Sequence, residues 1–270
     1  MVEKTTSAKI TGARIPDAKL GVFGAGGRMG REIIGMIAAT PGATLAGAVE
    51  AAGHACVGAH LSGGLVVCSN ARALAHTCDV LVDFTTPAAL ETNLDAARAA
   101  RRPMLIGTTG LGPAHMKAID SAAHEIAVLQ SANVSLGVTL LAALVEQAAA
   151  RLPTWHAEIL ELHHAGKTDA PSGTALLLGQ AVARGRGHAL PAPRAARGGV
   201  RPDAEIGFAS LRGGTSAGEH SVLLLGQGER IELTHRAESR AILAAGAIAA
   251  AMWLKGRSPG RYTMKDVLSL

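Results

Sequence analysis

A short apolar run, a glycine-rich turn and a helical pattern follow one another near the start of this chain, and they constrain its fold most. Leu20–Gly24 is apolar, Gly24–Gly30 has the spacing G-x-x-G-x-x-G, and Arg31–Ala39 has helical periodicity. A second apolar run, Ala43–Val49, comes next. Strand, turn, helix and strand in this order predict a βαβ unit, which requires a parallel sheet.

Further apolar runs alternate with helical stretches downstream. The helical stretches are Ala88–Ala100 and Pro113–Ile126, and the predicted strands are Val80–Asp83, Pro103–Ile106 and Ala127–Gln130. Regular alternation of strands and helices produces layered α/β architectures. We therefore expect an α/β fold with a doubly wound parallel sheet over residues 20–134.

The pattern changes after about residue 135, where a second domain is expected. A helix over Gly137–Leu152 precedes a strand over Ala157–Leu162, and a loop rich in Pro, Gly and Arg spans Arg184–Pro202. Three later runs suit antiparallel strands: Glu205–Leu211, His220–Gln227 and Glu229–His235. These features predict a smaller α+β domain with a mixed sheet over residues 135–240. We expect residues 1–19 to form a flexible tail and residues 241–270 to rejoin the first domain.

The composition favours a well-packed protein that binds small anions. Hydrophobic residues make up 48% of the chain and charged residues 17%, so a large core can be buried. Two Trp, one Tyr and three Phe are too few for base-stacking surfaces, so no nucleic-acid partner is expected. The net charge of +5 suits small acidic ligands instead.

Neither a membrane span nor a secretion signal is predicted. The longest apolar run, Ala241–Leu254, is shorter than the roughly 20 residues that a span needs. Residues 1–19 lack the apolar core of a signal peptide. Cys56, Cys68 and Cys78 lack disulfide or metal-ligand spacing and are interpreted as reduced structural thiols. We expect a cytoplasmic protein with no membrane partner.

The glycine turn and an acid downstream of it predict a dinucleotide site. Without side chains, the turn and the following helix can approach a pyrophosphate closely. Glu50 lies 20 residues beyond Gly30, at the end of the second strand, where a carboxylate meets ribose hydroxyls. The turn alone is also compatible with a glycine-rich connection that binds no nucleotide.

Two other loops follow predicted strands of the same sheet. They are Gly107–Gly110 and Ser131–Val134. Ligands of open α/β sheets collect at the carboxyl ends of the strands, so both loops could line one cofactor. Each loop taken alone has the composition of an ordinary turn.

A dense polar cluster occupies Glu161–Thr174. Imidazole titrates near neutral pH, lysine carries positive charge, and the turn Ser172-Gly173-Thr174 offers donors to a carboxylate. Adjacent residues of an extended segment point to opposite faces, so His163 and His164 are poorly placed to bind one metal, and no metal site is expected. The cluster favours an active site for a small acidic substrate over structural histidines. Glu161 and Asp169 could orient or charge-balance the cluster, or could be structural.

These segments together resemble the dihydrodipicolinate reductase family of the lysine and diaminopimelate pathway, and the resemblance spans nearly the whole chain. The motifs that carry it are Gly24–Gly30, Asp83-Phe-Thr, Gly107–Gly110, Ser131–Gly137, Glu161–Thr174, Gly207-Phe-Ala-Ser, Gly218-Glu-His220 and Trp253-Leu-Lys-Gly. It implies an oxidoreductase in which a nicotinamide cofactor delivers hydride to C4 of 4-hydroxy-tetrahydrodipicolinate, with loss of water. It also implies a Rossmann-like domain and a substrate-binding and oligomerisation domain whose sheets assemble a homotetramer.

The resemblance also implies roles for individual residues. His163 matches the proton donor and acceptor, and Lys167 matches a second proton-donating and substrate-binding position. The implied contacts to substrate carboxylates are His164, Lys167, Ser172, Gly173 and Thr174. The implied cofactor contacts are Gly24, Ala25, Gly26, Gly27, Arg28, Met29, Glu50, Gly107, Thr108, Thr109, Ser131, Ala132, Asn133 and Val134.

Two departures from the family pattern bear on the cofactor. Many bacterial members have a basic residue after the ribose-binding acid, whereas Ala51 follows Glu50 here. Glu50 without that cation should repel the 2′-phosphate, so we predict a preference for NADH with residual NADPH use through Arg28. Val134 replaces an aromatic residue that some relatives place against the nicotinamide.

Two other functions remain open from the residues alone. One is another two-domain NAD(P)-dependent dehydrogenase, acting on an amino acid or a polyol, although the Ser-Gly-Thr cradle counts against a polyol. The other is a non-catalytic dinucleotide sensor, which would have little use for His163, His164 and Lys167.

Overall fold

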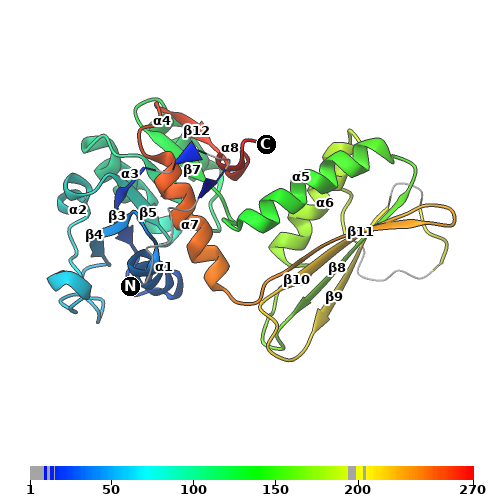
Figure 1. The fold of residues 1–270 in the computed structure, drawn as a ribbon, viewed down its shortest axis with the longest axis horizontal. Helices are drawn as coiled ribbons and strands as arrows, with labels where there is room; N and C mark the ends of the chain where they lie inside the picture. The colour runs from blue at the N-terminus through cyan, green and yellow to red at the C-terminus, as the bar shows by residue number, and fades with distance from the viewer. Residues whose placement is uncertain (1–8, 11–12, 15, 194–198, 203–204) are drawn as a thin grey trace, which may run out of the picture. The chain divides into compact units, whose positions relative to one another are not determined.

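The computed structural model describes residues 9–10, 13–14, 16–193, 199–202 and 205–270 (Figure 1). The chain forms two compact units. One contains the described residues up to Ser135 together with Ala241–Ser269, and the other contains those of Leu136–Arg240. Most of the tail expected over residues 1–19 lies outside the described residues. Within it, Lys9–Ile10 (β1) and Ala13–Arg14 (β2) pair as antiparallel strands.

The first unit contains a six-stranded parallel sheet, which confirms the predicted fold class. The strand order is β12-β7-β6-β5-β3-β4. The strands are β3 (Ala18–Phe23), β4 (Ala43–Val49), β5 (Val80–Asp83), β6 (Met104–Ile106), β7 (Ala127–Gln130) and β12 (Gly260–Tyr262). The chain runs from β3 to β4 in one direction and then places β5 on the other side of β3. The strand order therefore reverses between β3 and β5, where open α/β sheets bind ligands.

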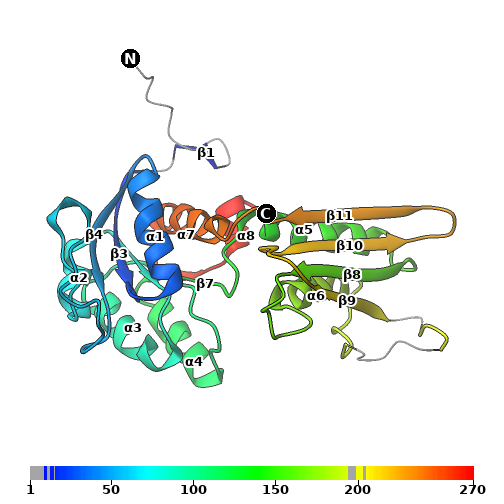
Figure 2. The same cartoon turned by 90° about the horizontal axis from the view of Figure 1, so that it is seen from below.

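Helices cover both faces of this sheet (Figure 2). On one face α1 (Arg28–Ala39) packs against α7 (Ala241–Leu254), and α7 also contacts β5, β6 and β7. On the other face lie α2 (Ala71–Thr77), α3 (Leu90–Ala99) and α4 (Pro113–Ala123). Short helical segments are η1 (Ser62–Gly64), η2 (Pro87–Ala89) and α8 (Met264–Leu268). The central strands β5 and β6 have helices on both sides, which explains why all of their residues are buried.

The second unit contains a four-stranded mixed sheet with helices α5 (Leu136–Arg151) and α6 (Gly173–Gly185) packed on one face. The strand order is β11-β10-β8-β9, with β8 at His156–His163, β9 at Ile206–Arg212, β10 at Glu219–Leu225 and β11 at Arg230–Arg236. The expected antiparallel pairing is wrong for β9, which runs parallel to β8. The reason is α6, a crossover helix between β8 and β9 that the sequence prediction missed.

The polar loop of the second unit begins two residues later than predicted. Because α6 extends to Gly185, the connection begins at Arg186 rather than Arg184. Within the predicted loop, residues 194–198 lie outside the described residues. In the part of the chain that the structure describes, no helix is long and apolar enough to cross a bilayer.

Candidate active site

The glycine turn joins the carboxyl end of β3 to the amino end of α1. Gly24 has a φ of +86°, and a Cβ there would lie 2.8 Å from the carbonyl oxygen of Phe84. A Cβ at Gly30 would overlap the carbonyl oxygen of Gly24. Only glycine at these two positions therefore allows the tight turn that leads into α1. The N-cap residue of α1 is Gly27. Of the other predicted turn residues, Ala25 is buried, Met29 is half-buried and Arg28 is exposed.

Glu50 extends from the end of β4 to the same turn. Its Oε2 accepts a hydrogen bond from the backbone N–H of Gly26 at 2.8 Å, and its Oε1 accepts one from Ala51 at 2.9 Å. The structure thus brings together the turn and the acid that the sequence places 20 residues apart. Two backbone donors hold the carboxylate beside the helix amino terminus.

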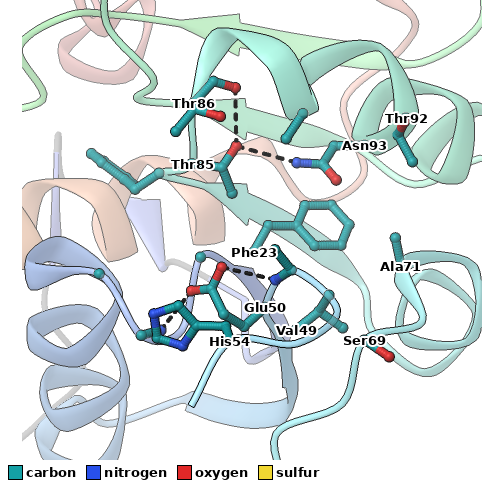
Figure 3. Close-up of a pocket in the computed structure, with 16 residues that line it drawn as sticks. Phe23, Val49, Glu50, His54, Ser69, Ala71, Thr85, Thr86, Thr92 and Asn93 are labelled. Atoms are coloured by element: carbon teal, nitrogen blue, oxygen red, sulfur yellow. Dashed lines mark hydrogen bonds between the residues drawn. The ribbon is translucent and has the colours of Figure 1, made fainter. Parts of the chain in front are cut away.

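A cleft of about 490 Å³ opens beside this pair at the end of β3, β4 and β5 (Figure 3). Its lining includes Gly24, Gly26, Gly27 and Glu50 of the predicted cofactor residues. The remaining lining residues are Phe23, Val49, Ala51, His54, Ser69, Ala71, Phe84, Thr85, Thr86, Ala89, Thr92 and Asn93. A cleft lined by both apolar and polar residues, with the carboxylate of Glu50 among them, is suited to a nucleoside.

A buried carboxylate holds the loop on the far side of this cleft. Oδ1 of Asp83 accepts hydrogen bonds from the N–H and hydroxyl of Thr85 and from Thr108, and Oδ2 accepts one from Asn93. Burial raises the pKa of Asp83, although these hydrogen bonds act in the opposite direction. Asp83 and Asn93 had no predicted role, and both shape the loop that carries Thr85.

The other two predicted cofactor loops do not line this cleft. Thr108 is buried and bonded to Asp83, while Gly107 lies against the ring of Phe84, where a Cβ would collide. Ser131 bonds within its own loop, to the carbonyl oxygen of Asn133 at 2.6 Å, and Val134 is buried. Thr109 and Ala132 are exposed, at the carboxyl ends of β6 and β7. The two loops share an edge of the sheet, as expected, but several of their side chains stabilise the protein itself.

In the second unit, Glu161 is the centre of a buried polar network on β8. Its Oε2 accepts hydrogen bonds from Nδ1 of His163 and from Arg212 at 2.9 Å. Its Oε1 accepts from the N–H of Ser172 at 3.1 Å and from Arg212 at 2.8 Å. Burial alone would raise the pKa of Glu161, but hydrogen bonds, chiefly from Arg212, outweigh it and lower the pKa to about 2. Glu161 is therefore an anion at every physiological pH.

His163 is a neutral imidazole with a fixed orientation. Burial lowers its pKa, and its bond to Glu161 only partly offsets that effect. Because a carboxylate accepts only, Nδ1 of His163 carries the proton and Nε2 has a free lone pair. The ring of His220 lies edge-on at 5.1 Å, and burial lowers its pKa to about 4. The site therefore contains two uncharged rings beside one fixed anion.

Lys167 and His164 lie in the turn that follows β8. Nζ of Lys167 contacts both carboxylate oxygens of Asp169, at 2.7 and 2.9 Å. Nε2 of His164 accepts a hydrogen bond from Arg240 at 2.9 Å, and both residues line an open depression with residues 214–217. The two adjacent histidines thus have different partners, as their opposite faces predict.

Ser172-Gly173-Thr174 is the start of α6 rather than an isolated turn. Ser172 is buried, caps the helix through a bond from the N–H of Ala175, and contacts Nε2 of His220 at 3.1 Å. Gly173 is exposed with open space where a Cβ would lie, and Thr174 is half-buried. A helix amino terminus favours anions, so the predicted carboxylate cradle has a second physical basis.

Arg212, His220 and Arg240 were not assigned roles from the sequence. Strand register explains the first two: Arg212 pairs with His163 across β8 and β9, and His220 pairs with Glu161 across β8 and β10. His220 lies within Gly218-Glu-His220, one of the motifs of the family resemblance, and this motif could have indicated that His220 belongs to the site. Arg212 lies 51 residues from Glu161, in the same strand as the Gly207-Phe-Ala-Ser motif but two residues beyond its end.

Comparison with known proteins covers both units. Residues 18–134 match the family model of "Dihydrodipicolinate reductase, N-terminus", and residues 137–268 match that of "Dihydrodipicolinate reductase, C-terminus". A 4-hydroxy-tetrahydrodipicolinate reductase of Methylocella silvestris is 47% identical over 94% of this chain and 98% of its own. One of Zymomonas mobilis is 49% identical over 93% of this chain and 97% of its own.

Solved structures share the fold. A dipicolinate-bound dihydrodipicolinate reductase from Paenisporosarcina sp. TG-14 has a TM-score of 0.75 at 22% identity, over 91% of this chain and 97% of its own. A scyllo-inositol dehydrogenase from Lactobacillus casei has a TM-score of 0.57 at 10% identity, over 94% of this chain and 93% of its own. The second likeness reflects a fold that several dehydrogenases share.

Proposed function

The chain belongs to the dihydrodipicolinate reductase family, and from this premise we propose that it reduces 4-hydroxy-tetrahydrodipicolinate to tetrahydrodipicolinate, with NADH as the preferred cofactor. The reaction takes up one hydride and one proton and releases water. The observation that carries the cofactor preference is the Glu50 carboxylate beside Gly26, followed by Ala51.

The first unit fits a dinucleotide. Gly24, Gly26 and Gly30 have no room for a Cβ, so only glycines allow this tight turn, and Gly27 caps α1, whose amino terminus favours a pyrophosphate. Glu50 is proposed to bind the ribose hydroxyls of the adenosine, with Thr85 and Asn93 on the opposite wall of the cleft. When bound, the nicotinamide supplies the hydride. The loops Gly107–Thr109 and Ser131–Val134 are proposed to border it.

The second unit is proposed to bind the dicarboxylate and to handle the proton. Lys167 supplies positive charge, and Gly173 and Thr174 present the amino terminus of α6 to a carboxylate. The Paenisporosarcina relative was solved with dipicolinate, which is also a dicarboxylate, and this supports the proposed substrate class. His164 and Arg240 add polar groups beside the turn.

His163 is proposed to hold and donate the proton at Nε2. In its neutral form Nε2 is free to take up a proton, and the permanently charged Glu161 then stabilises the imidazolium through Nδ1. Glu161 acts through His163 and is a positioning residue. Arg212 holds Glu161 with two hydrogen bonds and prevents it from rotating away.

A coupled assay tests the proposal. The substrate is synthesised in place from pyruvate and aspartate semialdehyde, and oxidation of NADH or NADPH is followed by absorbance. We expect turnover with both and kcat/KM at least about tenfold higher with NADH, equivalent to about 1.4 kcal/mol. Turnover with a clear NADPH preference would contradict the cofactor proposal. Absence of turnover despite NADH binding would favour a dinucleotide sensor.

The exposed face of the second sheet supports the proposed homotetramer. Leu160 and Leu211 are 39% and 50% exposed, and they lie on the face opposite α5 and α6. Leucines on one open sheet face favour contact with another copy of the chain. Sedimentation velocity should give a tetramer for the natural chain and smaller species for Leu160→Asp. A monomeric natural chain would contradict the proposed homotetramer. We also propose that the enzyme is cytoplasmic and has no nucleic-acid or membrane partner.

A further inference from the structure

Three residues with different metal-binding atoms meet beside the glycine turn. The carboxylate of Glu50, the imidazole of His54 and the thiol of Cys56 each offer one ligand atom, and these atoms all lie within 4.8 Å of one another. Nδ1 of His54 lies 3.1 Å from Sγ of Cys56. Both side chains pack on Gly26, where a Cβ would lie 2.9 Å from that sulfur. The cluster therefore adjoins the turn that is proposed to bind the dinucleotide.

The separation of these atoms suits a tetrahedral ion. Bonds of about 2.0–2.3 Å to nitrogen, oxygen and sulfur put neighbouring ligand atoms roughly 3.3–3.8 Å apart, so small side-chain movements suffice. The backbone N–H groups of Gly26 and Ala51 hold the Glu50 carboxylate and would orient it as a ligand. His54 is exposed and lines the cleft, so an ion can enter from solvent and retain a water as fourth ligand.

The ligand set selects the kind of ion. Thiolate and imidazole favour Zn²⁺ over the oxygen-seeking Mg²⁺ and Ca²⁺. Binding would release the thiol proton to solvent and replace the weak hydrogen bond from the N–H of Cys56 to Nδ1 of His54, which is 3.2 Å long. A second group, Glu161, His163 and His220, also has clustered ligand atoms. It is buried, and Arg212 already bonds both oxygens of Glu161, which disfavours a cation there.

We propose that Glu50, His54 and Cys56 form a Zn²⁺ site whose occupation competes with the dinucleotide, because the ion would occupy the carboxylate that is proposed to bind the ribose. The competition rests on the proposed function, whereas the metal site does not. Zinc would thus inhibit the enzyme from the cofactor side.

Titration of the complete, reduced, cofactor-free chain with Zn²⁺ tests the site directly. Calorimetry should show one Zn²⁺ per chain, and Co²⁺ as a probe should give the visible and near-ultraviolet bands of thiolate coordination. Cys56→Ser should weaken Zn²⁺ binding at least about tenfold, because a hydroxyl is a poor zinc ligand. The matched control is Cys68→Ser, which removes an exposed thiol outside the cluster and should bind Zn²⁺ as the natural chain does. His54→Gln is a second variant, and thermal unfolding checks that each variant folds.

Competition is tested by NADH binding, followed through nicotinamide fluorescence. At a free Zn²⁺ concentration ten times its Kd, exclusive binding should raise the apparent Kd of NADH about 11-fold. Cys56→Ser should bind NADH normally without metal and lose most of this effect. The site is refuted if the natural chain binds no Zn²⁺ or if Cys56→Ser binds it equally well. Zinc binding with unchanged NADH affinity would refute the competition, whereas failure to bind NADH without metal would refute the proposed function instead.

Discussion

The glycine turn of the first unit and the Glu161 network of the second recognise charge by different means. The turn is closely packed and leads into the amino terminus of α1, and all of its parts lie between Gly24 and Glu50. The network uses ionised side chains shielded from solvent, and its members come from three strands and a helix. In the proposed function, a local turn binds the cofactor phosphates, whereas proton transfer uses a buried carboxylate whose charge Arg212 balances.

The largest effect is expected at the proton-handling ring. His163→Gln removes the titratable nitrogen and should lower kcat about 10²- to 10⁴-fold in the coupled assay, with little change in NADH affinity. The matched control is His156→Gln at the exposed beginning of β8, which should leave kcat unchanged. Wild-type turnover by His163→Gln would show that this ring does not handle the proton.

The next effect concerns the carboxylate behind that ring. Glu161→Gln should lower kcat about 100-fold, toward the lower end of the range for lost acid–base assistance. Loss of the anion should also lower the pKa of His163 and move the pH profile of kcat to lower pH. The control, Glu219→Gln, removes a similar but exposed ion pair with Arg236 and should change little. An unchanged pH profile with reduced stability would leave Glu161 only a structural role.

Glu161 also makes stability depend on pH. Its pKa of about 2 in the folded chain lies below its ordinary value of 4.5. The stabilisation is therefore complete above pH 4.5 and is lost as the pH falls toward 2. Glu161→Gln should show a flatter acid-unfolding curve than Glu219→Gln in this interval, measured by circular dichroism.

An intermediate effect is expected at the glycine turn. Gly30→Ala would force a Cβ into the carbonyl of Gly24 and should cost about 1–3 kcal/mol of unfolding free energy while weakening NADH binding. Gly35→Ala, on an exposed position of the same helix with open space around it, should instead stabilise by about 0.4–1 kcal/mol. Equal effects of the two substitutions, measured by thermal unfolding and NADH titration, would contradict the close-approach argument.

The smallest effect is a change of cofactor ratio. Ala51→Arg places a cation next to Glu50 in the cleft lining and should raise kcat/KM for NADPH about tenfold relative to NADH. Ala52→Arg adds the same charge one residue further along and outside the lining, and should leave the ratio nearer that of the natural chain. Equal ratios in both variants would assign the effect to net charge alone.

Much of the first unit could be predicted from local patterns. The apolar runs and the glycine spacing predicted the parallel sheet, and the position of Glu50 predicted that this acid and the glycine turn belong to one dinucleotide site, because βαβ units have a fixed order and hand. The helix α7 coincides with the apolar run Ala241–Leu254. The orientation of β9 was predicted wrongly, because the polar segment from Lys167 to Thr174 concealed the start of the crossover helix α6.

Local patterns in the chain predicted the doubly wound sheet, since it depends on short-range spacing and periodicity, and the motifs shared with a known family indicated the family and the residue types of the two candidate sites. Only the tertiary structure showed that Arg212 secures Glu161, that His220 lies against His163, and that Asp83 holds Thr108. These contacts depend on strand register and burial, which bring together residues that are far apart in the sequence. His220 and Glu161, for example, are 59 positions apart and are paired in the register of β10 and β8. Register follows from the packing of whole strands and helices, and no local motif encodes it.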